Sequence, residues 1–337
     1  MRILFVTTDR EDCGVREYGK TLMEFAVKAD PGLVFQEWTN PNPMSIPHPD
    51  GYDIVHLNHV RGIFSVNSGM GEYLWSNGQI DFLHELGKAV IVTQHDSTEN
   101  WATMMYYKLA DFTAADALVV HEKVKGLTDS CPRAHFFPQG VLPAEQPRYS
   151  GNQFRVGSVG FPFPWKNYDL LCEASAEAGW GVVLIAPRAT PVQIEKWRSL
   201  NERAEIYPEF LPRKEMVQIL SGCDATAFLY RLVDFQGSGS SAAIRVGIAA
   251  RKPVIAFPAS INRQVKDLEG DNRILWALDK AGVVKRLHSC EDPDFSKAAS
   301  EGIRQIAERD SWEEVGRRYA RLYAEARCTA NLEKMAI

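Results

Sequence analysis

The sequence lacks paired cysteines and long apolar runs. Its six cysteines are far apart and form no C-x-x-C pair, so neither a zinc knuckle nor a disulfide framework is indicated, and free thiols in a reducing compartment are favoured. No run of 18 apolar residues occurs, and the apolar segment at the N-terminus is too short for a signal peptide. We therefore expect a cytoplasmic protein without a transmembrane segment, with peripheral contact to a membrane left open.

Basic residues are also outnumbered by acidic ones, and several catalytic motifs are absent. Lys and Arg number 38 against 43 Asp and Glu, a net charge of −5, so a chain-wide basic surface for nucleic acid is absent, although a local basic groove is compatible with this balance. There is no Walker A sequence, no G-x-S-x-G turn and no kinase motif set, so the hydrolase and kinase classes have no support. His56 and His59 have no carboxylate or third histidine at ligand spacing, and we expect no metal site.

Short apolar runs followed by stretches of helical periodicity are present along the whole chain. This alternation is typical of βα units and predicts an α/β fold with parallel sheets. In the first half we expect strands at Ile3–Thr7, Ile54–Leu57, Ala89–Thr93, Ala117–Val120 and His135–Phe137, and helices at Val15–Lys28, Gly71–Leu86, Trp101–Ala110 and Glu122–Ser130. In the second we expect strands at Phe154–Val159, Gly181–Ala186, Ile206–Phe210, Ala225–Tyr230 and Val254–Phe257, and helices at Tyr168–Ala178, Lys214–Ser221 and Ser241–Ala250.

The length of 337 residues fits two domains of about 150 to 170 residues each. A polar stretch with two prolines, Pro143 to Gly151, is typical of a linker. We therefore predict one Rossmann-like domain over residues 1–145, a second over 152–310, and a helical tail over 311–337 that packs back on the first domain. In this tail Trp312, Val315, Tyr319 and Tyr323 recur at three- and four-residue spacing, a stripe expected to pack against a core.

Polar residues stand just after the expected strands. In open parallel sheets ligands bind beyond the carboxyl ends of the strands, so these residues are the candidates for a site. In the first half they include Thr7, Thr8, Asp9, His56, Asn58, His59, Gln94, His95, Asp96, His121 and Gln139; in the second half they include Gly160, Arg188, Tyr230 and Arg231. Two domains that face each other would bring both sets to a central cleft.

The strongest local feature is the run Gly237-Ser238-Gly239-Ser240-Ser241 before an apolar helix. Small residues let backbone N–H groups approach an oxyanion at the start of a helix, which predicts a phosphate cradle. The alternative is that Ser240 or Ser241 only caps the helix while the glycines form a turn. The run also matches G-x-G-x-x-A, but no acidic residue follows the next strand to hold a ribose, so a dinucleotide fingerprint is not supported.

Several cationic residues accompany this run. Lys166 follows Gly160 and an aromatic FPFPW stretch, where an ammonium group suits a diphosphate. Arg231 and Arg245 are further candidates to hold phosphate, with a purely structural ion pair as the alternative for each. Arg188 and Tyr230 complete the donor-side candidates by their positions after strands.

The first half offers His95 with Asp96 after AVIVTQ, and Gly14 in the loop before the first helix. An imidazole at a strand end can act as a general base, a hydrogen-bond donor or an orienting group, and a structural histidine is the alternative. Gly14 permits close approach of a ligand to a helix start, although an ordinary turn glycine would look the same.

Several segments of the sequence, in their order along the chain, resemble the GT-B glycosyltransferases of family 4. The similarity is carried by RILFVTT, YDIVHLNH, VIVTQHDS, ADALVVHE, FFPQGV, RVGSVGFPFPWKNYDLL, CDATAFLY and GSGSSAAIRVGIAARKPVIAFP. The resemblance implies that Lys166 contacts a donor diphosphate cradled by the Gly239–Ser241 amides. It also implies that His95 lies beside the transferring sugar and Gly14 near the donor phosphate or acceptor, without a bound metal.

The chain departs from the family pattern in two places. Where the family commonly has a glutamate, seven residues and a second glutamate, this sequence has Gly237 or Ser238 and Arg245 or Val246. The arginine that often precedes the lysine is replaced by the Phe161–Trp165 stretch.

We therefore expect a cytoplasmic, metal-independent hexosyl- or pentosyltransferase with a nucleotide sugar as co-substrate and no other cofactor. The acceptor, a glycan, a lipid-linked sugar or a small molecule, stays open. The alternatives left open are a nucleotide-sugar epimerase, a non-catalytic nucleotide-binding module and a transferase that acts on a modified DNA base. The sequence names neither the sugar nor the nucleotide.

Overall fold

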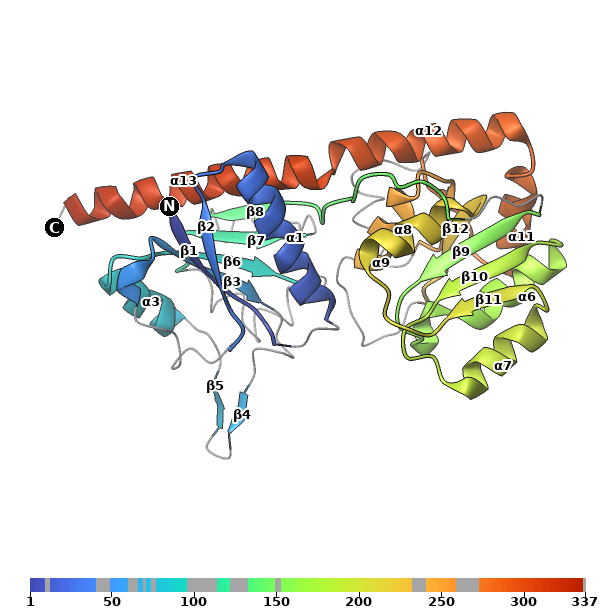
Figure 1. Cartoon of the computed structure of the whole chain (residues 1–337), viewed down its shortest axis with the longest axis horizontal. Helices are drawn as coiled ribbons and strands as arrows, with labels where there is room; N and C mark the ends of the chain where they lie inside the picture. Colours follow the sequence, from blue (N-terminus) through green and yellow to red (C-terminus); the bar gives the residue numbers. More distant parts are fainter. Residues whose placement is uncertain are drawn as a thin grey trace. The chain divides into compact units, whose positions relative to one another are not determined.

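The computed structural model describes residues 1–9, 13–40, 49–59, 66–68, 71–73, 77–95, 114–121, 133–148, 153–231, 241–258 and 273–335. The chain divides into two compact units, the first comprising Met1–Gln139, Gly237–Ser240 and Trp312–Ile337, and the second comprising Gly140–Gln236 and Ser241–Ser311. Each unit contains a six-stranded sheet with helices packed against it (Figure 1). The predicted α/β fold with two parallel sheets is confirmed.

The sheet of the first unit has the strand order β2-β1-β3-β6-β7-β8, and every pairing is parallel. The strands are β1 Arg2–Val6, β2 Val34–Trp38, β3 Ile54–His59, β6 Ala89–Gln94, β7 Ala117–Val120 and β8 Ala134–Phe136. A separate antiparallel hairpin joins β4 Val66–Ser68 and β5 Gly71–Tyr73. The strand order changes direction between β1 and β3, which makes this the topological switch point where ligands bind in open sheets.

Helices cover both faces of this sheet. They are α1 Gly14–Ala29, α3 Asn77–Glu85 and α13 Trp312–Met335, with a short 3₁₀ turn, η2, at Pro49–Gly51. Because successive residues of a strand point to opposite faces, Leu4 and Val55 pack in a cluster with Leu83 of α3. Phe5 and His56 point to the other face, against α1 and α13.

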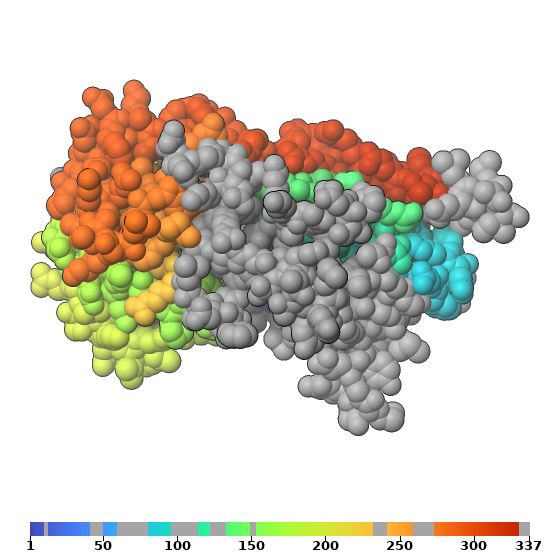
Figure 2. Space-filling view, turned by 180° about the vertical axis from the view of Figure 1, so that it is seen from behind, coloured from blue at the N-terminus to red at the C-terminus, as the bar shows by residue number. Residues whose placement is uncertain are grey.

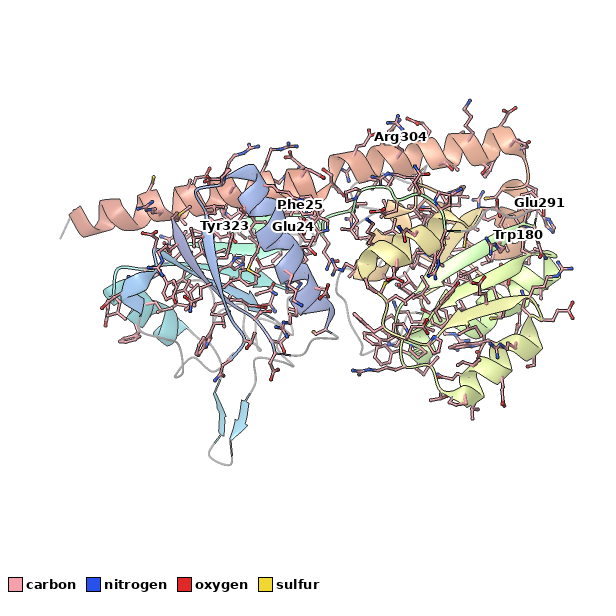
Figure 3. All side chains as sticks on the ribbon, viewed as in Figure 1. Glu24, Phe25, Trp180, Glu291, Arg304 and Tyr323 are labelled. Atoms are coloured by element: carbon pink, nitrogen blue, oxygen red, sulfur yellow. The ribbon has the colours of Figure 1, made fainter. Side chains whose placement is uncertain are left out.

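The stripe predicted in the C-terminal tail packs against this core. Trp312, Val315, Tyr319 and Tyr323 are all buried, and the Trp312 ring stacks on Phe25 of α1. Tyr323 lies where α13 meets the sheet (Figure 3). The prediction that this stripe is a packing face is confirmed.

A chain of buried hydrogen bonds joins α13 to the sheet and to α1. The Tyr323 hydroxyl lies 2.6 Å from His56 Nδ1, and His56 Nε2 lies 2.9 Å from Thr93 Oγ1. Thr93 Oγ1 contacts the Tyr319 hydroxyl at 2.7 Å, and that hydroxyl contacts the Tyr18 hydroxyl at 3.1 Å. Burial lowers the pKa of His56 to about 3 and raises the pKa of both Tyr319 and Tyr323. His56 is therefore a neutral structural residue.

His56 is expected to make the protein sensitive to acid. Its pKa is about 3 when folded and near 6.5 when exposed, so between these values the unfolded chain binds the additional proton. The free energy of unfolding should then fall as the pH is lowered through this window, by up to about 1.4 kcal/mol per pH unit. Urea denaturation of wild type and His56→Gln between about pH 4 and pH 7 measures this slope. The exposed His288→Gln is the control, and equal slopes in wild type and His56→Gln would contradict the assignment.

The sheet of the second unit has the order β11-β10-β9-β12-β13-β14, again wholly parallel. The strands are β9 Arg155–Val159, β10 Gly181–Ile185, β11 Ala204–Tyr207, β12 Ala225–Phe228, β13 Val254–Ala256 and β14 Leu275–Trp276. This is the strand order of a Rossmann fold, and its switch point lies between β9 and β12.

The helices of the second unit cover both faces of its sheet. They are η4 Pro164–Lys166, α6 Tyr168–Glu177, α7 Pro191–Leu200, α8 Arg213–Ser221, α9 Ala242–Ala249, α11 Lys280–Ser289 and α12 Pro293–Arg309. Residues of α8, α9 and α12 pack with Val159 and Val183 in one cluster, and residues of α6, α7 and α11 pack with Val156 and Val182 in the other. Seen from behind, α12 forms part of the surface of this unit (Figure 2).

Several sequence-based expectations need correction. The predicted helix Gly71–Leu86 is wrong in its first part, because Gly71–Tyr73 forms β5 and the helix begins only at Asn77. The strand expected at Ile206–Phe210 instead spans Ala204–Tyr207. Strand β2 and helices α7 and α11 were not expected at all. The helices predicted at Trp101–Ala110 and Glu122–Ser130 lie outside the described residues.

Candidate functional site

Lys166 lies in a tight loop that follows the end of β9. This strand end is at the switch point of the second sheet. Gly160 directly follows this strand and has a φ of +134°, a conformation that side chains rarely adopt. A Cβ on Gly160 would lie 3.0 Å from Lys166 Nζ, so the ammonium group passes directly over the glycine. Gly160 is therefore required both for the turn and for the place of the lysine.

Lys166 is held among aromatic side chains. It is 6% exposed, its Nζ donates to the Tyr230 hydroxyl at 2.7 Å, and it lies 4.0 Å from the centre of the Tyr230 ring and 4.8 Å from that of Trp165. Burial lowers the pKa of Lys166 to about 7. In the part of the chain that the structure describes, no carboxylate pairs with this ammonium group. Lys166 is thus a poorly solvated cation suited to an anionic ligand.

The same tyrosine connects Lys166 to the start of α9. The Tyr230 hydroxyl lies 2.9 Å from Ser241 Oγ, and Ser241 is the N-cap residue of α9. The Ser241 side chain makes no capping hydrogen bond, so its position does not fit the simple capping alternative. The N–H groups of the first turn point out of the helix and favour an anion there.

Two arginines lie near the loop that carries Lys166. Arg231 donates its backbone N–H to the Trp165 carbonyl at 2.9 Å and its Nε to Asn167 Oδ1 at 3.0 Å, which ties the ends of β9 and β12 together. Arg188 follows β10 with a φ of 67°, and its guanidinium carbon lies 5.7 Å from the centre of the Phe161 ring. Both arginines therefore belong to the same edge of the sheet as Lys166.

Arg245 has a different environment. It is 3% exposed, and its Nη1 forms an ion pair of 2.7 Å with Asp310, which Arg309 also contacts. A structural ion pair of this kind was the alternative to phosphate binding that the sequence left open for Arg245. Among the described residues the buried Nε and Nη2 of Arg245 have no hydrogen-bond partner, so a contact of this residue with phosphate stays a prediction.

Four candidates, Asp96, Gly237, Gly239 and Ser240, lie outside the described residues.

A second polar group lies at the switch point of the first sheet. His95 follows β6, and its Nε2 is 2.7 Å from Asn58 Oδ1 at the end of β3. The His95 ring lies 4.7 Å from that of Tyr18 and 4.9 Å from that of His121, measured between ring centres. Gly14 is the first residue of α1, and among the described residues no atom lies within 4 Å of the place where a Cβ on it would stand.

From the sequence, Asn58 was only one of the polar candidates at strand ends, and no site role was expected for Tyr18, Trp165 or Asn167. The position of Asn58 at a strand end next to the switch point was a signal for it, whereas the other three follow from contacts that only the folded chain shows. Among the residues described here, no group of three or more His, Cys, Asp or Glu side chains could hold a metal ion. Within the same residues, no helix is long and apolar enough to cross a membrane.

No protein-family model matches the chain, and no curated protein matches it by sequence. Solved structures match it along almost its whole length. Anabaena HepE, in complex with UDP and glucose, has a TM-score of 0.66 at 12% identity over 96% of this chain and 100% of its own. Trehalose-6-phosphate synthase OtsA has a TM-score of 0.64 at 10% identity over 96% of this chain and 99% of its own. AviGT4, a glycosyltransferase involved in avilamycin A biosynthesis, has a TM-score of 0.62 at 12% identity over 98% of each chain.

These similarities show the fold. Both six-stranded sheets belong to the GT-B architecture of glycosyltransferases, and the resemblance stated from the sequence is confirmed at this level.

Proposed function

We propose that the protein is a glycosyltransferase that moves a hexosyl or pentosyl group from a nucleotide diphosphate to an acceptor hydroxyl without a bound metal. The observation that carries this proposal is the buried Lys166 ammonium group, joined through Tyr230 to the N-cap of α9 at a switch point. HepE, which shares the fold, is recorded in complexes with UDP and with UDP-glucose, which favours a UDP-sugar as donor.

Transfer of the sugar requires that the negative charge developing on the donor diphosphate be stabilised. As the bond between the anomeric carbon and the diphosphate oxygen breaks, negative charge grows on the leaving diphosphate. Lys166 and the first-turn N–H groups of α9 can stabilise that charge, and the aromatic surroundings of Lys166 strengthen the interaction by excluding water. The acceptor hydroxyl forms the new bond to the anomeric carbon, and its proton passes to the released diphosphate or to solvent, so that atoms and charge balance.

His95 keeps the role that the resemblance implies, beside the transferring sugar. Its place at the switch point of the first sheet, close to the Gly14 helix start, suits hydrogen bonds to a sugar or acceptor hydroxyl. Asp96, the next residue in the sequence, remains a candidate catalytic residue.

A thermal-shift screen followed by product analysis tests this function. UDP-, GDP-, ADP- and dTDP-sugars are compared, because a ligand that binds only the native state raises its stability by about 2.7 kcal/mol at 100 times its Kd. We expect one nucleotide class to stabilise the protein and transfer to occur in EDTA when an acceptor is supplied. Sugar isomerisation without an acceptor would indicate an epimerase, and binding without turnover a non-catalytic module. No stabilisation by any nucleotide sugar would refute the proposal.

A further inference from the structure

Asn58 is buried at the switch point of the first sheet and contacts three elements at once. Its side chain is fully buried, and its Nδ2 donates to the Val15 carbonyl at 2.8 Å and to Thr7 Oγ1 at 3.2 Å. Its Oδ1 lies 2.7 Å from His95 Nε2. One amide therefore joins the ends of β1, β3 and β6 to the first turn of α1.

These partners determine which way the amide points. The Val15 carbonyl can only accept a hydrogen bond, so the nitrogen of Asn58 must face it and the oxygen must face His95. An oxygen of this kind only accepts, so His95 Nε2 has to carry the proton. A neutral imidazole has a single N–H, and the lone pair is therefore on Nδ1.

The packing of α1 holds this arrangement in place. A Cβ on Gly19 would lie 3.1 Å from Asn58 Nδ2 and 2.7 Å from Phe5 Cε1, so α1 approaches the strand ends as closely as a glycine permits. Tyr18, the preceding residue, stands edge-on to the His95 ring, and its hydroxyl contacts that of Tyr319 at 3.1 Å. The Asn58 amide cannot turn over without losing its hydrogen bond to the Val15 carbonyl of α1.

We propose that Asn58 is a positioning residue that keeps neutral His95 in the Nε2–H tautomer, so that Nδ1 is the acceptor atom of the ring. Through the Val15 carbonyl, Asn58 also fixes His95 relative to the helix start at Gly14. The tautomer follows from geometry alone, whereas its use on a sugar or acceptor hydroxyl rests on the proposed glycosyltransferase function.

Nitrogen-15 NMR of the histidine side chains in the intact protein tests the tautomer directly. Protonated and unprotonated ring nitrogens give well separated signals, and the His95 signals are identified by their loss in His95→Gln. At a pH where His95 is neutral, we expect its proton on Nε2 and its Nδ1 unprotonated. A proton on Nδ1, or an even mixture of tautomers, would overturn the proposal, and this reading needs neither turnover nor a folded Asn58 variant.

A variant then tests the positioning role. Asn58→Leu removes the amide at similar volume, so the His95 tautomers should mix and kcat should fall about 10- to 100-fold with little change in donor Kd, as for other outer partners of a functional histidine. The matched control is Asn201→Leu in the second unit, which removes an amide of similar burial bonded to Ser175 Oγ and the Trp180 carbonyl. This control should leave the His95 tautomer unchanged.

The outcomes separate the two claims. If Asn58→Leu keeps both the Nε2–H tautomer and wild-type kcat, Asn58 does not position His95. If the wild type transfers no sugar, the proposed function fails, and the NMR reading still decides the tautomer.

Discussion

Replacing Lys166 with methionine is expected to lower kcat/KM for sugar transfer by about 10²- to 10³-fold, the range found when one group that stabilises transition-state charge is removed. The lysine is buried against Tyr230 and Trp165, and methionine fills a similar volume. Because the variant no longer buries an ammonium group, its thermal stability should be unchanged or higher. Steady-state kinetics with a saturating acceptor and a thermal melt measure both quantities.

The control is Lys196→Met. Lys196 is exposed and pairs with Asp169 at 2.6 Å, so its loss should change stability and turnover little. Wild-type turnover in Lys166→Met would remove Lys166 from the mechanism. A collapsed melting temperature would instead show that the buried lysine is structural.

Donor binding is expected to weaken as the pH rises above 7. Burial holds the pKa of Lys166 at about 7 rather than 10.5, so most molecules lose the ammonium charge in mildly alkaline solution. A diphosphate binds the charged form and raises this pKa, so the affinity should fall by up to about tenfold per pH unit above 7, with one proton taken up on binding. Calorimetric titration with a nucleoside diphosphate at pH 6 to 9, in two buffers of different ionisation enthalpy, measures both effects.

The lowered pKa of Lys166 also makes the free energy of unfolding depend on pH. Between pH 7 and 10.5 the unfolded chain holds a proton that folded Lys166 has lost, so this residue makes the free energy of unfolding rise with pH in that window. Lys166→Met should remove both pH dependences. A donor affinity that is flat from pH 6 to 9 in the wild type would contradict the low pKa or the contact with the diphosphate.

Much of the second unit could be predicted from its sequence. Its central strands are continuous apolar runs, because parallel strands are buried on both faces, and such runs are visible without a structure.

Other elements were not predicted. The edge strand β2 of the first unit is only partly buried and carries Gln36 and Glu37, so it has no such run. Helix α7 was missed although Thr190, Pro191 and Gln193 form a capping box with proline at the first turn, a signal present in the sequence.

The candidate site was predictable in position but not in contacts. The strand ends pointed to Tyr230 and His95, because parallel strands bring their carboxyl ends to one edge. The glycine- and serine-rich run before a helix pointed to Ser241, and the aromatic stretch after Gly160 pointed to Lys166. The burial of Lys166 depends on Tyr230, 64 residues away, and could not be inferred from the local sequence. The pairing of Arg245 with Asp310 spans 65 residues and could not be inferred from local pattern.

The place of the donor diphosphate is the central claim, and a crystal structure of the protein with a bound UDP-sugar tests it most directly. We expect diphosphate oxygens within hydrogen-bonding distance of Lys166 Nζ and of the first-turn N–H groups of α9. A nucleotide bound elsewhere, or a crystal in which saturating UDP-sugar leaves this edge of the second sheet empty, would contradict it.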